Sequence, residues 1–291
     1  MRPRHTAAGA VTVVLTLAAC GASAPPRHSQ GAGPQRAGFT DPTRIDNRWL
    51  PLVPGTRYTL VGHANRGDER LRHREVLVVT DLTKVIDGVR TVVIWDRDFA
   101  AGRLREGELA FNAQDDRGNV WNFGEYPELF ERGRVAGAPD TWIVGLAGAR
   151  AGIAMRADPR ADTPTYRQGL APAIDFADEA RVYRLGRPMC IPLRCFADVL
   201  ETDEWTPAEP GAHQRKYYAR GVGTIRVGAV GDREDEILVL DRVEHLDPGE
   251  RAAVRRAALR IDERAYRVSR HLYGKTPRAE ATPRAGEEQR R

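Results

Sequence analysis

Short runs of β-branched and aromatic residues recur between residue 57 and residue 245, and turn residues separate them. Val76-Leu77-Val78-Val79-Thr80 is one such run, and Asp87-Gly88 is one such turn. Runs of this composition, repeated at intervals of roughly a dozen residues, are typical of antiparallel strands. We predict strands over residues 57–64, 70–83, 89–99, 106–114, 118–124, 179–186, 196–206, 213–220, 222–229 and 235–245.

The predicted fold is therefore mainly β, with a curved antiparallel sheet or half-barrel of about ten strands over residues 39–247. Residues 125–175 interrupt the pattern, because Gly, Ala and Pro are frequent there. Such composition favours turns and irregular connections. We expect long loops or short helices in this segment.

One long helix is predicted after the sheet. Asp247-Pro248-Gly249-Glu250 has the residues of a capping box with proline at the first helical position. The apolar residues that follow are spaced by four and three, which places them on one helical face: Val254, Ala258, Ile261, Ala265, Val268 and Leu272. We predict a basic amphipathic helix over 248–273 and a disordered tail over 274–291.

The arginine-rich side of this helix leaves three interpretations open. The apolar stripe packs on the sheet, or the helix lies on an anionic membrane surface, or it pairs with a helix of a protein partner. The alanine-rich stripe is narrow, which suits close packing better than deep insertion into lipid.

The first residues have the composition of a secretory signal. A positive start at Met1–His5 precedes an uncharged apolar segment from Ala7 to Ala19. Leu17-Ala18-Ala19-Cys20 resembles the bacterial lipobox. This resemblance implies removal of residues 1–19 as a lipoprotein signal peptide and lipidation of Cys20, with acyl chains such as palmitate. Residues 20–38 are predicted to be a flexible tether. We expect the protein at the extracytoplasmic face of the cell membrane, held there by the lipid on Cys20.

The distribution of charge argues against a nucleic acid partner. Residues 39–247 contain 29 Lys and Arg against 34 Asp and Glu, whereas residues 248–291 contain 12 against 6. The positive net charge therefore belongs to the two ends of the chain and not to the predicted β domain. We predict no nucleic acid partner.

Besides Cys20, the chain has Cys190 and Cys195. An even number of cysteines in an exported domain favours a disulfide, here across a short turn. A reactive or metal-binding pair is the alternative, although two cysteines are too few for a structural zinc site.

Several classes of enzyme lack their residues here. Serine occurs only at Ser23, Ser29 and Ser269, so the predicted β domain has no serine nucleophile. Neither a phosphate-binding Gly-rich loop with lysine nor a His-Glu-x-x-His motif is present. We predict no cofactor and no metal site, we assign no catalytic residue, and we favour a protein that is not an enzyme.

Two sets of residues are candidates for a site. Carboxylates at Glu201, Asp203 and Glu204 form a candidate acidic site, since residues 201 and 203 share one face of a strand. A solvated strand face paired with arginines is the alternative. A candidate ligand pocket consists of aromatic side chains and one acid that recur near polar residues: Trp121, Phe123, Glu125, Trp205, Tyr217 and Tyr218. These rings equally suit an ordinary β core.

Four motifs resemble those of a family of secreted bacterial lipoproteins that has no established activity. The likeness extends over about residues 39–245. It implies a largely β envelope protein and carries no catalytic residues over. The cysteine pair and the long basic helix depart from the family pattern. A looser likeness is to open β half-barrels that carry lipids or lipoproteins. The motifs are Pro-Gly-Thr-Arg at 54–57, Asp-x-x-Gly-Asn-Val-Trp at 115–121, Glu-Trp-Thr-Pro at 204–207 and Lys-Tyr-Tyr-Ala-x-Gly-Val-Gly at 216–223.

These observations support three hypotheses for function. The first is a lipid-anchored, non-enzymatic module that binds an apolar or amphipathic ligand, such as a lipid, or a protein partner. The second is an envelope glycan hydrolase that uses paired carboxylates. The third is a structural or signalling protein that binds its partner through helix 248–273.

Overall fold

A computed structural model describes residues 38–66, 69–231 and 236–282. Within these residues, 16 strands form one sheet, and every pairing between named strands is antiparallel. The predicted fold class is confirmed, although the strands outnumber the ten that were expected. The ten long strands are β1 (Thr56–Arg66), β2 (Glu69–Ile86), β3 (Val89–Ala100), β4 (Arg103–Gln114), β5 (Val120–Glu131), β11 (Glu179–Cys190), β12 (Cys195–Trp205), β13 (His213–Ala219), β14 (Gly223–Val230) and β15 (Ile237–His245).

The expectation of loops or short helices over 125–175 is wrong for much of that segment. β5 continues to Glu131, and further short strands follow with a single 3₁₀ turn. Strands of two to six residues are too short to show a periodic pattern, so only their long-range pairing defines them. They are β6 (Arg134–Gly137), β7 (Trp142–Ile143), β8 (Arg150–Met155), β9 (Tyr166–Arg167), β10 (Gly169–Leu170) and η2 (Pro172–Ile174).

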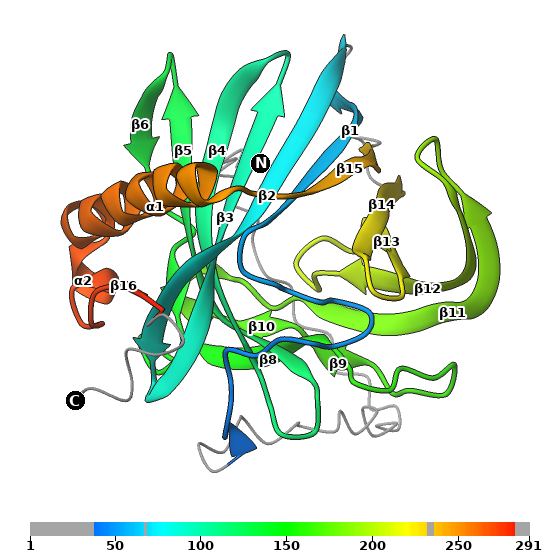
Figure 1. The fold of residues 1–291 in the computed structure, drawn as a ribbon, viewed down its shortest axis with the longest axis horizontal. Helices are drawn as coiled ribbons and strands as arrows, with labels where there is room; N and C mark the ends of the chain where they lie inside the picture. The colour runs from blue at the N-terminus through cyan, green and yellow to red at the C-terminus, as the bar shows by residue number, and fades with distance from the viewer. Residues whose placement is uncertain (1–37, 67–68, 232–235, 283–291) are drawn as a thin grey trace, which may run out of the picture.

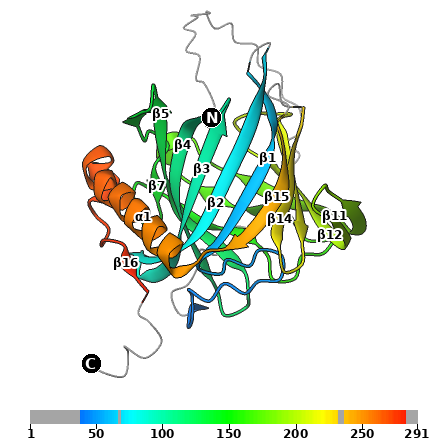
Figure 2. The same cartoon turned by 45° about the horizontal axis from the view of Figure 1, so that its top comes forward.

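The sheet curves until it nearly closes into a barrel (Figures 1 and 2). Its two ends are β9, which pairs with β11, and β10, which pairs with β8. Only Gln168 separates β9 from β10 in the chain, so the single segment 166–170 joins the two edges. Gly152 permits this arrangement, because a Cβ atom there would lie 2.2 Å from the backbone of Gln168.

The segment before β1 crosses the barrel and fills one end of its interior (Figure 1). Trp49 and Leu52 are almost completely buried in the interior core cluster, together with Leu60 and Leu240 of the sheet. Asn47 fixes the segment, because its side-chain amide donates to the backbone oxygens of two distant loops at 2.8 and 3.1 Å. This segment forms the floor of the barrel.

The C-terminal helix packs on the outer face of the sheet (Figure 2). It divides into α1 (Pro248–Val268) and α2 (Arg270–Tyr273), so the single predicted helix is interrupted at Ser269. The capping box is present, since Asp247 accepts from the Glu250 N–H and Glu250 accepts in return. Ala258, Ile261 and Ala265 of the predicted stripe are buried, whereas Val268 is 39% exposed. The interpretation in which the stripe packs on the sheet agrees with this arrangement.

Ion pairs add to this contact. Lys84 of β2 is fully buried, and its ammonium lies 3.0 Å from the Asp262 carboxylate of α1. Arg255 pairs with Asp81, and Arg264 pairs with Glu128. A protein partner for this helix, which stays a prediction, would therefore have to contact its outer arginine-rich side.

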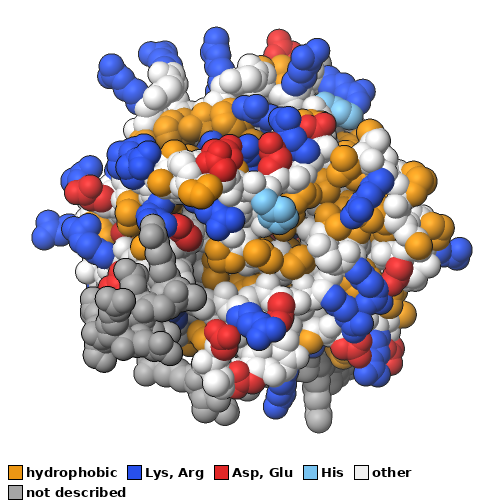
Figure 3. All heavy atoms as spheres, viewed as in Figure 1, with side chains coloured by type: hydrophobic (Ala, Val, Ile, Leu, Met, Phe, Trp, Pro, Cys, Tyr) orange, Lys and Arg blue, Asp and Glu red, His pale blue; other side chains and the backbone are white. Residues whose placement is uncertain are grey.

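In the face shown in Figure 3, Lys and Arg side chains are spread widely and mixed with Asp and Glu.

The predicted disordered tail is wrong for residues 274–282. These residues run back to the sheet, where β16 (Glu280–Ala281) pairs with Thr83 and Leu82 of β2. The Pro277 carbonyl also accepts from Lys84 at 2.6 Å. Composition alone predicts disorder for this polar segment. It is ordered because Pro277 accepts from the buried Lys84 ammonium and because β16 pairs with β2.

The predicted signal peptide, the lipidation at Cys20 and the tether up to residue 37 lie outside the described residues. Among the helices of the described ranges, none has the length and apolar character needed to cross a bilayer.

Candidate ligand-binding cavity

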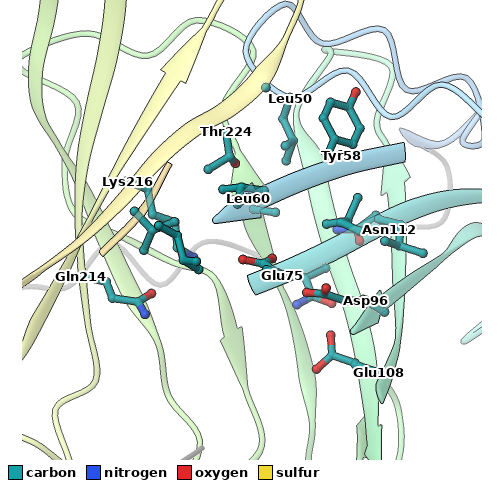
Figure 4. A pocket seen from close by; sticks show the side chains of 18 of the residues that line it. Leu50, Tyr58, Leu60, Glu75, Asp96, Glu108, Asn112, Gln214, Lys216 and Thr224 are labelled. Atoms are coloured by element: carbon teal, nitrogen blue, oxygen red, sulfur yellow. The ribbon is translucent and has the colours of Figure 1, made fainter. Parts of the chain in front are cut away.

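The barrel interior contains a cavity of about 470 Å³ above the floor segment. Apolar side chains line the part of the cavity next to the floor segment, and polar and charged side chains form most of the rest (Figure 4). The apolar part includes Leu50, Leu60, Ile94, Val222 and Leu238. The cavity is thus amphipathic and lies inside the sheet rather than on its surface.

Carboxyl groups from three neighbouring strands project into the cavity (Figure 4). They belong to Glu75 of β2, Asp96 of β3 and Glu108 of β4. Asp96 and Glu108 are direct partners in the β3–β4 register. Glu75 and Asp96 hydrogen-bond to each other. We call these three side chains the acidic wall.

Burial raises the pKa of Glu75 and of Glu108 well above the ordinary value, and neighbouring carboxyls raise both further. Burial also raises the pKa of Asp96, although its hydrogen bond to Glu75 opposes this effect. Like charges held close together away from bulk water favour the protonated form. The acidic wall therefore retains protons at pH values where exposed carboxyls are ionised.

Two cationic side chains of the cavity already have partners. Lys216 of β13 lies 2.8 Å from the Glu204 carboxylate. Burial alone would lower the pKa of Lys216, but Glu204 raises it above the ordinary value. His73 lies between Asp98 and Glu236, at 2.9 and 2.7 Å. Burial opposes protonation of His73, yet these two acids raise its pKa to about 9.

The structure places only two members of the candidate aromatic pocket at the cavity, namely Glu125 and Tyr218. Glu125 accepts there from the Trp142 indole N–H at 3.0 Å. Alternation turns Trp205 and Tyr217 to the opposite face of their strands. Trp121 and Phe123 lie on the opposite face from Glu125 because the β4–β5 register shifts between residues 122 and 125. Trp121 and Phe123 pack in the outer cluster beneath the helix, Trp205 contacts His213, and Tyr217 lies in a groove outside the sheet.

The candidate acidic site is divided between the two faces of β12. Glu201 and Asp203 lie on the outer face, where Asp203 contacts Arg181, Arg215 and His213. Glu204 lies on the inner face and also accepts from Thr202 at 2.8 Å. These three acids do not form the pair across a cleft that the hydrolase hypothesis requires.

Cys190 and Cys195 form a disulfide across the turn between β11 and β12, as predicted. The bond closes the tip of this hairpin, away from the cavity-lining residues. In the described parts of the chain, no cluster of His, Cys, Asp or Glu has the arrangement of a metal site.

The three residues of the acidic wall are not among the site residues predicted from the sequence. A signal was available, because Asp96 is followed by Asp98 and Glu106 by Glu108, each pair at the two-residue spacing of a strand face. Two adjacent strands with such pairs indicate a shared acidic surface. The sequence does not show that this surface faces inward.

No family model matches this chain, and no curated protein matches it. Two solved structures are similar to it. One is a Bacteroides fragilis protein described as a predicted exported protein with a YmcC-like fold; its identity is 16%, with 68% of this chain and 99% of that chain covered and a TM-score of 0.38. The other is a Parabacteroides distasonis protein described as a predicted lipoprotein; its identity is 10%, with 70% and 100% covered and a TM-score of 0.34.

Proposed function

We propose that this protein is a lipid-anchored cell-envelope protein that binds an amphipathic ligand inside its sheet and catalyses no reaction. One observation carries the proposal: a cavity of about 470 Å³ within the barrel has an apolar part and a polar part. This volume falls within the range of about 300–1,000 Å³ that is usual for small-molecule sites.

The arrangement of the floor supports this function. Side chains of the segment before β1 fill one end of the barrel and leave the remaining space open to a ligand. An apolar chain would contact Leu50 and Leu60 near this floor, while a polar head would meet the charged side chains above it. Burial of apolar groups supplies affinity, and polar groups of the wall fix orientation.

The proposed anchor would keep the cavity near the membrane that supplies the ligand. Residues 20–38 could extend over at most roughly 68 Å. Intact-mass analysis of the processed protein tests the anchor, since lipidation adds diacylglycerol and acyl chains to Cys20. A mature protein without this added mass would contradict the anchored form of the proposal.

Binding of linear alcohols of increasing length tests the ligand site. Each buried methylene contributes about 0.8 kcal/mol, so we expect affinity to rise about fourfold per methylene until the cavity is full. Ala154 lines the cavity, and Ala154→Phe should abolish binding. Val243→Phe, on an exposed position of β15, is the matched control and should bind normally.

Native mass spectrometry of protein extracted from its own membrane adds an independent readout. We expect one small molecule to accompany the protein. A protein that carries no molecule and binds none of the alcohols would overturn the proposed function.

A further inference from the structure

The chemistry of the cavity wall narrows the class of ligand. Glu75, Asp96 and Glu108 present three carboxyls to one space, and no ion pair to any of them occurs among residues 38–66, 69–231 and 236–282. The Glu108 side chain also makes no hydrogen bond within these ranges. The acidic wall thus faces a cavity and has no cation paired with it in these ranges.

The cationic side chains that line the cavity are engaged elsewhere. Lys216 pairs with Glu204, and His73 pairs with Asp98 and Glu236. The groups that face the acidic wall are therefore mostly acids. The titratable groups are Tyr58 from β1, His73 and Glu75 from β2, Asp96 and Asp98 from β3, Glu106 and Glu108 from β4, Glu125 from β5, Lys216 and Tyr218 from β13, and Asp178 and Glu236 from connecting segments.

We propose that the cavity selects amphipathic ligands whose head is a protonated amine, with the ammonium bound by Glu75, Asp96 and Glu108 and the apolar chain bound against Leu50 and Leu60. This inference rests on the proposed function. The head of a fatty acid or a phosphate brings no cation to these carboxyls, so they would stay protonated and the anion would lie in the cavity without an ion pair, which is unfavourable in a space removed from bulk water.

Binding of the amine should also release a proton from the acidic wall to the solvent. Without ligand, the acidic wall holds protons, because burial and neighbouring acids raise the pKa of Glu75 and Glu108. An ammonium that arrives with its own proton stabilises the ionised carboxylate. The carboxyl then loses its proton to solvent, so one amine bound as ammonium releases up to about one proton.

Three probes with the same chain distinguish this inference from the proposed function. Dodecylammonium, 1-dodecanol and dodecanoate, each below its micellar concentration, are titrated into the protein in an isothermal calorimeter. We expect the amine to bind most tightly and dodecanoate most weakly. Repeating the amine titration in two buffers of different ionisation enthalpy should show proton release.

Glu108→Gln keeps the size of the side chain and removes its charge. We expect the affinity for dodecylammonium to fall about 10- to 100-fold, the range for a lost hydrogen bond to a charged group. Proton release should decrease, while the affinity for dodecanol should stay within about twofold. Glu131→Gln, exposed at the end of β5, is the control and should leave all three affinities unchanged. Asp96→Asn serves as a second variant if Glu108→Gln does not fold.

Each outcome decides one of the two proposals. Equal affinity for amine and alcohol, with no effect of Glu108→Gln, would overturn the amine selectivity and leave the proposed function in place. Binding of none of the probes would overturn the proposed function itself. Preference for the amine that Glu108→Gln removes would support both.

Discussion

Replacing Glu106 with glutamine should change how the stability of the protein depends on pH. Glu106 of β4 lies opposite Asp98 of β3. Burial, reinforced by the charges of Asp96 and Asp98, raises its pKa from 4.5 to about 7. The folded protein therefore holds this proton more tightly than the unfolded chain does. The resulting stabilisation is present below the unfolded pKa and is lost as pH rises through about 7.

The size of the loss follows from the two pKa values. At 1.36 kcal/mol per pKa unit, it amounts to about 3 kcal/mol between acidic pH and a pH above the folded pKa. For a domain of this size, this corresponds to about 6–12 °C in melting temperature. Glu106→Gln removes the titrating group, so its stability should fall about 3 kcal/mol less over the same interval.

Urea denaturation followed by tryptophan fluorescence, repeated from about pH 4 to about pH 8, measures this difference. Glu131→Gln is the matched control, because residue 131 is an exposed glutamate of the neighbouring strand β5. It should follow the parent protein at every pH. A constant separation between the parent and Glu106→Gln across the whole pH interval would refute the reasoning.

Three further predictions concern the scaffold. Lys84→Met leaves the buried Asp262 carboxylate without its cation, and chemical denaturation should show a loss of about 3–5 kcal/mol; a loss below about 1 kcal/mol would contradict this role. Serine at both Cys190 and Cys195 opens a short loop, which should cost about 2 kcal/mol in the same assay but leave ligand affinity unchanged. Asp247→Ala removes the N-cap of α1 and should lower the free energy of unfolding by about 1 kcal/mol, with Asp247→Asn restoring most of it.

The long strands and the helix start could be predicted from sequence because their signals are local. β-branched runs define β2 and β3, and the capping residues define the start of α1. The short strands between residues 134 and 170 carry no such signal, because pairing with distant partners creates them. The interruption at Ser269 likewise follows from packing, since its side chain is buried against Thr141.

The cavity could not be located from sequence because both faces of several strands are covered. Glu75 faces the interior, while Val76 is buried on the outer face near the start of α1. Alternation along a strand separates the side chains of one face from those of the other, but it does not show which face lies inside the barrel. One motif that suggested a site is also structural, since Asp115 accepts from the Asn119 backbone N–H and from the Trp121 indole, which fixes a turn.

The join between β9 and β10 has a mechanical consequence for the barrel. Two residue pairs connect β9 to β11 and two connect β10 to β8, whereas β1 pairs with β2 over ten positions and β14 with β15 over three. In the described parts of the chain, detaching either side of this join separates the fewest register pairs of any step around the circumference. Gln168, at its centre, also lines the cavity. The circumference of the barrel is therefore easiest to enlarge at segment 166–170. The backbone amide protons of this segment should exchange with solvent faster than those of the other strands of the barrel wall.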